Sequence, residues 1–203
     1  MDIAGSVALV TGAGCGLGAR FATELLDRGA SKVYATARKP ASVTVPGVEV
    51  LALDLLDPSS IAAAAAAAQD VTLLVNNAGV STGQNLVRGD PAEVRRELET
   101  NFFGILAVTR AFADVLAANG GGAIVNVFSA LSFFSWDGVT SYCASKAAEW
   151  SQPGEGGWTG PGAYVAAVWD SAGSVLALTA VPAAAGLAVG RLIRKSQATH
   201  PPE

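Results

Sequence analysis

The first 150 residues alternate between short apolar runs and longer segments in which apolar residues recur at helical spacing. The apolar runs are bounded by Gly, Pro, Asp or Asn, which is typical of strands buried on both faces. The runs predicted to be strands are Val7–Val10, Lys32–Thr36, Val48–Leu53, Val71–Val75 and Ala123–Phe128. The segments predicted to be helices are Leu17–Arg28, Ser59–Gln69 and Pro91–Ala118.

The third predicted helix has the clearest start signal. Asp90 is placed to cap it, Pro91 suits its first turn, and Glu93 lies where the acid of a capping box belongs. Its apolar stripe contains Asn101, and a buried amide without hydrogen-bond partners would lose roughly 1–3 kcal/mol. Gly104 follows at a position that costs about 1 kcal/mol relative to Ala. We therefore expect a backbone segment or an ordered water to approach this helix closely.

Strands that alternate with helices predict an α/β fold. The expected architecture is a doubly wound parallel sheet of the Rossmann type, covered by helices on both faces. The chain has 203 residues, which is enough for one such domain. We assign this domain to residues 1–151.

The alternation ends after residue 151. From Pro153 to Gly162 seven of ten residues are Gly or Pro, a composition that cannot continue a helix. Ala163–Trp169 could form one further strand. We expect the C-terminal strands and helix to be incomplete or aberrant, and residues 152–203 to be an atypical Gly/Pro/Ala-rich segment rather than an independent domain.

Ser171–Gly190 is a run of twenty residues without a charge, followed by Arg191, Arg194 and Lys195. Its length and flanking charges fit a membrane span. However, Ala, Gly, Ser and Pro182 dominate the run, and only six of its residues are Val or Leu. We favour a buried Ala-rich segment, or one that does not fold properly, over a membrane span.

Composition excludes several other classes of protein. With 51% hydrophobic and 15% charged residues the chain does not read as disordered, and a net charge of −4 with scattered Lys and Arg gives no nucleic-acid footprint. Cys15, Cys143 and the single histidine His200 provide neither a disulfide framework nor a Cys/His metal site. The N-terminus lacks the basic start and apolar run of a signal peptide, so we expect a cytoplasmic protein.

A glycine-rich turn, Thr11–Gly18, follows the first predicted strand and opens the first predicted helix. In this setting glycines let a pyrophosphate approach the backbone N–H groups at a helix N-terminus. A plain glycine-rich turn is the alternative, but the position between strand and helix favours dinucleotide binding.

Polar residues also follow the later predicted strands, at the sheet edge where a doubly wound fold binds its ligand. Arg38 follows the second strand, and no acid stands there to accept the ribose hydroxyls of NAD. Because an arginine can pair with the 2′-phosphate of NADP, NADP is favoured over NAD, with a solvated Arg–Lys loop as the alternative. Asp54 follows the third strand and could accept a hydrogen bond from the adenine amino group, with an ordinary strand-end carboxylate that faces water as the alternative.

The fourth and fifth predicted strands end in polar residues as well. The amides of the Asn-Asn-Ala-Gly motif at Asn76–Gly79 could staple neighbouring loops, line the adenosine ribose, or do both. Ser129 ends the fifth strand and points to the same edge, although serines at strand ends are often simple turn formers.

Tyr142 and Lys146 stand four residues apart, so a helix there would place a phenol and an ammonium on one face. A phenol alone is a poor acid near neutral pH, with a reference pKa of about 10, and a fixed cation beside it favours the phenolate. An ordinary exposed Tyr–Lys pair is the alternative. The ligand-binding features upstream favour a catalytic pair.

Taken together and in this order, these motifs resemble the short-chain dehydrogenase/reductase family from about Val7 to about Trp150. The resemblance rests on the Thr-Gly-x-x-x-Gly-x-Gly turn, Asp54, the Asn-Asn-Ala-Gly motif, Asn101, Ser129 and the Tyr-x-x-x-Lys pair. It implies a Rossmann-type oxidoreductase that transfers a hydride between NAD(P)(H) and a small-molecule carbonyl compound or secondary alcohol.

The resemblance also implies a role for individual residues. Tyr142 would be the general acid in carbonyl reduction and the base in alcohol oxidation, while Ser129 would orient the substrate oxygen. Lys146 would bind the nicotinamide ribose, and Asn101 would hold a water in the proton relay. No metal is implied, and NADP is preferred as cofactor. The residues expected to bind it are Gly12, Gly16, Leu17, Gly18, Arg38, Asp54, Leu55, Asn77, Ala78, Gly79, Tyr142 and Lys146.

Beyond Trp150 the chain departs from the family, whose members continue past the lysine with a long helix. Here Gln152, Pro153 and Gly154 are expected to stop that helix about two turns after Lys146. Our hypothesis is that residues after about Ser151 are a substituted or frame-shifted tail. In this family the lost helix commonly packs against a dimer mate, so a homo-oligomer stays open.

Three functions are compatible with the sequence. The leading one is an NADP-dependent oxidoreductase. The second is a nucleotide-binding protein without turnover, impaired by the substituted tail. The third is a membrane-tethered protein anchored by Ser171–Gly190.

Overall fold

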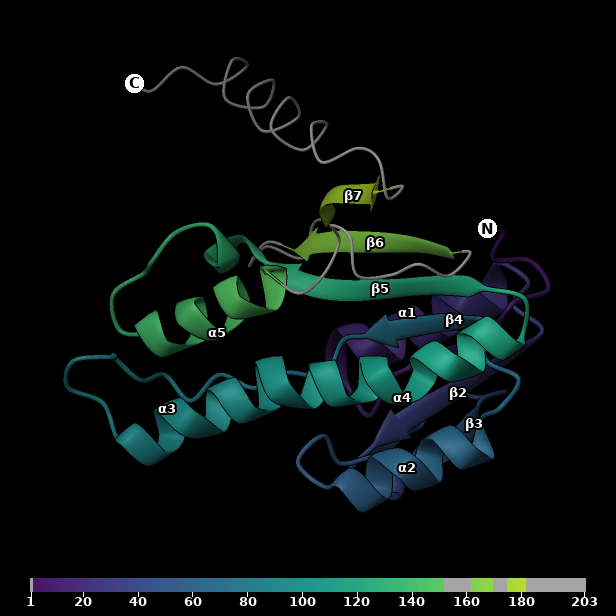
Figure 1. Ribbon diagram of the computed structural model, residues 1–203, viewed down its shortest axis with the longest axis horizontal. Helices are drawn as coiled ribbons and strands as arrows, with labels where there is room; N and C mark the ends of the chain where they lie inside the picture. Colours follow the sequence, from purple (N-terminus) through teal and green to yellow (C-terminus); the bar gives the residue numbers. More distant parts are fainter. Residues whose placement is uncertain (1, 152–161, 170–174, 182–203) are drawn as a thin grey trace, which may run out of the picture.

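The computed structural model describes residues 2–151, 162–169 and 175–181. Over these residues seven strands form one sheet, in the order β3-β2-β1-β4-β5-β6-β7 (Figure 1). All pairs from β3 to β6 are parallel, and β7 runs antiparallel to β6. The strands are β1 (Val7–Val10), β2 (Lys32–Ala37), β3 (Glu49–Ala52), β4 (Leu73–Asn76), β5 (Gly122–Ser129), β6 (Gly162–Trp169) and β7 (Val175–Val181).

The strand order reverses beside β1, because the chain first builds β2 and β3 outward on one side and then returns to place β4 on the other. This confirms the predicted doubly wound sheet and puts its switch point between β1 and β4. The helical elements are α1 (Gly16–Asp27), η1 (Pro40–Ser42), α2 (Pro58–Ala67), α3 (Pro91–Leu98), η2 (Glu99–Gly104), α4 (Ile105–Ala118), η3 (Ala130–Ser132) and α5 (Thr140–Trp150).

Both faces of the sheet carry a core, which explains why the strands read as unbroken apolar runs. In β1, Leu9 packs in a cluster with residues of α2 and α4, whereas Ala8 and Val10 pack in a second cluster with residues of α1. All three side chains are fully buried. The centre of the sheet is therefore fixed from both sides, and β1 and β4 present their carboxyl ends on a rigid base.

The predicted helix from Pro91 to Ala118 is continuous, with α4 following on from α3 (Figure 1). A π-helical segment, η2, lies between them. Gly104, the last residue of this segment, has no room for a side chain, because a Cβ there would lie 2.7 Å from the Cβ of Leu55 and 2.9 Å from its carbonyl oxygen. The close approach expected at Gly104 is thus made by a backbone segment, the loop between β3 and α2.

The start of α3 confirms one expected cap and corrects another. The Asp90 carboxylate accepts a hydrogen bond from the N–H of Ala92 at 2.8 Å. Glu93 does not complete a capping box, because the N–H of Asp90 donates to Oε1 of Gln84 at 3.0 Å and Glu93 pairs with Arg96 at 2.8 Å. A tertiary contact from the preceding loop has replaced the local one.

The described C-terminal strands agree in part with the sequence. β6 confirms the strand expected at Ala163–Trp169, whereas β7 was not predicted and takes up seven residues of the candidate membrane span Ser171–Gly190. α5 ends at Trp150, one turn after Lys146 instead of two. The rest of the tail, including most of the Gly/Pro-rich stretch, lies outside the described residues, so the frame-shift hypothesis stays a prediction.

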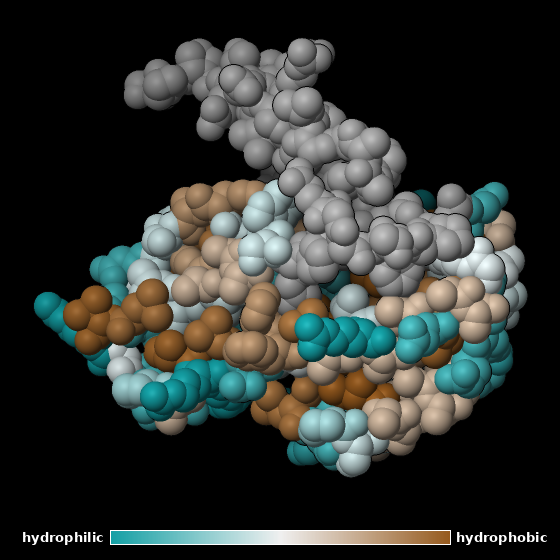
Figure 2. All heavy atoms as spheres, in the orientation of Figure 1, coloured by the Kyte–Doolittle hydropathy of each residue, from teal (hydrophilic) through white to brown (hydrophobic). Residues whose placement is uncertain are grey.

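Over the described residues, one helix is long and apolar enough to cross a membrane, the 28-residue stretch Pro91–Ala118. Its apolar side chains Ile105, Val108 and Phe112 are fully buried in the core, as in the central helix of a folded domain. Exposed apolar side chains lie elsewhere. Figure 2 shows hydrophobic atoms at the end of the molecule where the loop between β4 and α3 lies, and in this loop Leu86 and Val87 are exposed.

Candidate active site

The switch point between β1 and β4 is stapled by side chains. The Thr11 hydroxyl oxygen accepts hydrogen bonds from the N–H groups of Asn77 at 2.9 Å and Ala78 at 3.0 Å. In return the Asn77 amide donates to the carbonyl oxygens of Thr11 at 2.9 Å and Gly12 at 3.3 Å. Asn76 links β4 to its other neighbours, since its amide donates to Asn126 at 2.8 Å and to Thr109 at 3.0 Å. The stapling role expected for these amides is therefore present.

Three of the four glycines in the turn differ in what surrounds them. A Cβ on Gly12 would lie 2.9 Å from the Cα of Ala78, and one on Gly18 would lie 2.2 Å from the carbonyl oxygen of Gly12. These two positions are closed by packing. Gly16 has φ +54°, and a Cβ there would meet nothing within 4 Å. The first residue of α1 is therefore left open toward solvent, in the setting where helix N–H groups bind anions.

The turn forms one wall of a pocket of about 950 Å³. The carboxyl ends of β2 and β3 contribute Arg38 and Asp54, and the loop after β4 closes the other side. Arg38 is exposed, while the Asp54 carboxylate accepts a hydrogen bond from the N–H of Leu56 at 3.0 Å. Of the twelve residues predicted to bind the cofactor, this pocket brings together Gly12, Gly16, Leu17, Gly18, Arg38, Asp54, Leu55, Asn77, Ala78 and Gly79.

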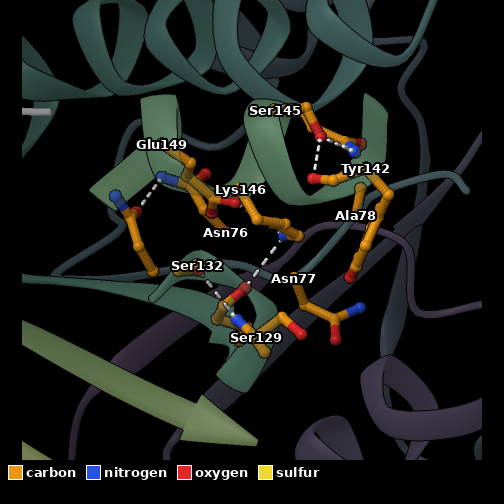
Figure 3. A network of polar contacts seen from close by, with 12 residues as sticks. Asn76, Asn77, Ala78, Ser129, Ser132, Tyr142, Ser145, Lys146 and Glu149 are labelled. Carbon is orange, nitrogen blue, oxygen red and sulfur yellow. Dashed lines mark hydrogen bonds and ion pairs between the residues drawn. The ribbon is translucent and has the colours of Figure 1, made fainter. Parts of the chain in front are cut away.

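The two remaining predicted residues, Tyr142 and Lys146, line a second pocket of about 790 Å³ together with Ser129. The two pockets share Leu17, Asn77, Gly79 and Val80, so they form one continuous crevice along the sheet edge. In Figure 3 the Tyr142 and Lys146 side chains extend from α5 toward Ser129 and Asn77. The structure therefore places the predicted catalytic side chains beside the predicted nucleotide pocket.

Two features of Ser129 fit the two interpretations made from the sequence, a turn former and a ligand-binding residue. Its hydroxyl oxygen accepts a hydrogen bond from the N–H of Leu131 at 3.2 Å, which caps η3. The same side chain is half-buried and lines the second pocket. The turn-forming task leaves the hydroxyl proton available for a ligand.

Asn101 lies in η2, is fully buried and lines neither pocket. Its amide binds both backbone groups of Val80 at 2.8 Å, accepting from the N–H and donating to the carbonyl oxygen. It also donates to the hydroxyl of Ser145 at 2.9 Å, and this hydroxyl donates to the carbonyl oxygen of Tyr142 at 2.8 Å. Asn101 thus joins the loop after β4 to α5, a positional task that the sequence did not reveal.

Lys146 is 4% exposed and does not stand alone. Its ammonium donates to Oε2 of Glu149 at 2.6 Å and to the carbonyl oxygen of Val127 at 3.1 Å. Glu149 is fully buried, and burial raises the pKa of its carboxyl to about 7 because the nearby ammonium offsets the loss of water only in part. Sequence reasoning missed Glu149, although its spacing of three residues from Lys146 was a usable signal.

An aromatic wall was also missed. Phe134 and Trp136 line the second pocket, and they are 52% and 63% exposed. Trp150, the last residue of α5, packs edge-to-face on Phe128 at 5.1 Å and on Phe133 at 4.9 Å between ring centroids. The wall faces the ligand space, whereas Trp150 fastens the end of α5 to β5 and to the loop after η3.

Known proteins match this chain over most of its described residues. A family model described as short chain dehydrogenase matches residues 6–150. D-erythrulose reductase from Gallus gallus is 38% identical over 154 residues, covering 73% of this chain and 62% of the relative. L-xylulose reductase from Homo sapiens is 34% identical over 152 residues, covering 72% of this chain and 62% of the relative. The matched part therefore spans about three fifths of the length of these curated relatives.

Solved structures resemble the chain over the same portion. A short chain dehydrogenase from Burkholderia cenocepacia J2315, in complex with NADP, is 44% identical with a TM-score of 0.71, and the match covers 74% of this chain and 64% of that one. A gluconate 5-dehydrogenase from the same organism, in complex with NADP and tartrate, is 25% identical with a TM-score of 0.67, and the match covers 72% of this chain and 62% of that one.

Proposed function

This chain belongs to the short-chain dehydrogenase/reductase family, and we propose that it transfers a hydride between NADP(H) and a small-molecule carbonyl compound or secondary alcohol. The observation that carries the proposal is the continuous crevice. Its nucleotide half contains the glycine turn, and its other half contains Tyr142, Lys146 and Ser129. A site for nucleotide alone would not need these three side chains in the adjoining pocket, so the arrangement favours an oxidoreductase over binding without turnover.

The residues of the first pocket fit a dinucleotide phosphate. Gly16 leaves the N-terminus of α1 open, and neither a side-chain cap nor an acidic residue occupies the first turn of that helix. Arg38 lies at the rim of this pocket and makes no ion pair with another described residue. It would meet a 2′-phosphate there, and Asp54 would meet the adenine. The NADP complexes of the two Burkholderia proteins support the same choice of cofactor.

Three side chains would carry the chemistry in the second pocket. Bound NADP(H) would supply or accept the hydride. Tyr142 would donate its phenolic proton to the carbonyl oxygen in reduction and recover it in oxidation. Ser129 would donate a hydrogen bond to the same oxygen and fix its position. Lys146 would hold the nucleotide ribose through its ammonium.

Asn101 would support the proton relay by holding the loop at Val80 against α5. We also propose that the protein is cytoplasmic, and we make no choice between a monomer and a homo-oligomer. The substrate would be uncharged over most of its length, because Leu131, Phe134 and Trp136 line the pocket on the side of the loop after β5.

The experiment is a fluorescence titration of the purified full chain with NADPH, followed by a panel of simple ketones and aldehydes. We expect saturable NADPH binding and oxidation of NADPH with at least one member of the panel. Saturable binding without oxidation by any of them would contradict the oxidoreductase and leave a nucleotide-binding protein. Absence of NADPH binding would contradict both.

A further inference from the structure

The ammonium of Lys146 has three N–H groups, and hydrogen bonds within the described part of the chain account for two of them. One donates to the carboxylate of Glu149 and one to the carbonyl oxygen of Val127. The amine also lies beside Gly79, because a Cβ added to that glycine would be 3.6 Å from Nζ. Gly79 and Lys146 both line the second pocket, so the third N–H is left on the ligand side.

We infer that Glu149 is a positioning residue that clamps the Lys146 ammonium, so that its one remaining N–H is presented to the ribose of the bound nucleotide. The identity of the ligand, a nucleotide ribose, rests on the proposed function. The clamp itself concerns only described residues. The two side chains lie one turn apart on α5, and together with Val127 they fix the amine between the helix and β5.

Stability alone does not account for this ion pair. Both side chains are nearly or fully buried, and Oε1 of Glu149 has no hydrogen-bond partner within the described part of the chain. A buried ion pair that leaves one oxygen unsatisfied gains little over apolar side chains of the same size. The pair does, however, hold a charged amine in a fixed position at the edge of a ligand pocket, which apolar side chains could not do.

Lys146 is the charged group that acts on Glu149. Burial makes the ionisation of Glu149 unfavourable, and among the described residues the Lys146 ammonium is the group that opposes this effect. β5 and η3, which pack against α5, contain no charged residue. The charged residues on the other elements packed against α5 are Glu93, Arg95, Arg96 and Glu97 of α3 and Glu99 of η2.

Glu97 provides a matched control. It is also a fully buried glutamate, and one of its oxygens has no hydrogen-bond partner among the described residues. Its other oxygen accepts hydrogen bonds from the backbone N–H and the hydroxyl of Thr82, and not from Lys146. Glu97→Gln therefore removes a buried carboxylate without touching the clamp. Glu149→Gln keeps the shape of the side chain and removes its charge, and Glu149→Asp keeps the charge but shortens its reach.

The first measurement needs no nucleotide. Pulse acylation with acetic anhydride at about pH 8, above the pKa of Glu149, reports the reactivity of each lysine amine by mass spectrometry. Because a charge-assisted hydrogen bond is lost, we expect Lys146 to react at least about fivefold faster in Glu149→Gln. The rate should be intermediate in Glu149→Asp and within about twofold of wild type in Glu97→Gln. An unchanged rate in Glu149→Gln, or an equal rise in Glu97→Gln, would overturn the clamp.

The second measurement tests the link to the ligand. NADPH affinity is compared between wild type and Glu149→Gln from about pH 6 to about pH 8, across the pKa of Glu149. Ionisation of the nucleotide phosphate is common to both proteins and cancels in the ratio of the two affinities. We expect this ratio to rise about fivefold with pH as the clamp becomes charged, and a flat ratio would overturn the positioning role. If wild type does not bind NADPH at all, the proposed function fails, while the acylation rates still decide the clamp.

Discussion

The nucleotide half of the crevice is held by the centre of the sheet, whereas the catalytic half is held by one short helix. In the first half Thr11 and Asn77 join the ends of β1 and β4 through four hydrogen bonds, and both strands are packed on each face. In the second half, α5 spans eleven residues and ends one turn after Lys146. Short helices depend on their packing partners, so catalysis should be more easily disturbed than nucleotide binding.

The largest expected effect comes from breaking the rigid half. In Gly18→Ala the new Cβ would lie 2.2 Å from the Gly12 carbonyl oxygen and 2.6 Å from the Asn77 amide, so the turn must open. Overpacking of this kind costs about 3 kcal/mol, and we expect NADPH affinity, measured by fluorescence titration, to fall about a hundredfold. Gly29→Ala is the control, because Gly29 has φ +84° at the far end of α1. It should lower stability but keep NADPH affinity within about twofold.

The next effect is a pH dependence of the free energy of unfolding, caused by Glu149 in the catalytic half. The pKa of Glu149 is about 7 in the folded chain against an ordinary value of 4.5. The folded state therefore binds the proton more tightly, and this stabilisation is complete below about pH 4.5 and is lost as pH rises to about 7. The loss amounts to about 3 kcal/mol. The free energy of unfolding, measured by urea denaturation, should fall between about pH 4.5 and about pH 7 in wild type but not in Glu149→Gln. An equal fall in Glu149→Gln would show that another group is responsible.

A variant that loosens α5 should lower turnover without lowering NADPH affinity. Trp150→Ala removes the edge-to-face contacts with Phe128 and Phe133 that fasten the end of the helix. We expect kcat to fall about tenfold, because small misplacements of catalytic groups carry large rate penalties, while NADPH affinity stays within about twofold. Phe103→Ala is the control, since Phe103 is half exposed and its edge-to-face partner is Phe102 in η2. Equal losses of turnover and affinity in Trp150→Ala would mean that the halves are not independent.

The smallest effect concerns the rim of the nucleotide half. Arg38→Ala should weaken NADPH binding about fivefold and leave NADH binding unchanged, because an exposed charge-assisted hydrogen bond contributes about 1 kcal/mol. Competition titrations with the two nucleotides measure both affinities. Arg28→Ala, at the other end of α1 where Arg28 lies near Glu24, should change neither. An equal loss of NADH affinity in Arg38→Ala would show that Arg38 does not bind the 2′-phosphate, which NADH lacks.

The sequence predicted most of the sheet because its strands are buried on both faces and stand out as apolar runs. β1 was predicted to the residue, and the other predicted strands within two residues at either end. The glycine turn and the strand-end residues were found for a related reason, since strand order brings the carboxyl ends of parallel strands to one edge. These signals are local, or follow from topology alone.

What the sequence did not reveal depends on contacts across the fold. The π-helical segment η2 has no distinct composition, and it arises where Asn101 must reach Val80 while Gly104 packs on Leu55. Glu149 was overlooked because charged residues are rarely buried, and its burial depends on α5 packing against β5. β7 was missed because its apolar residues lie inside a longer uncharged run without clear turn signals at both ends.

The most direct test of the account is the comparison of Tyr142→Phe with wild type in one experiment that records both NADPH affinity and NADPH oxidation. Tyr142 lines the catalytic half and not the nucleotide half, so the variant should bind NADPH within about twofold of wild type. Loss of the general acid should lower the oxidation rate about 10²- to 10⁴-fold. An oxidation rate unchanged by Tyr142→Phe would contradict the central claim.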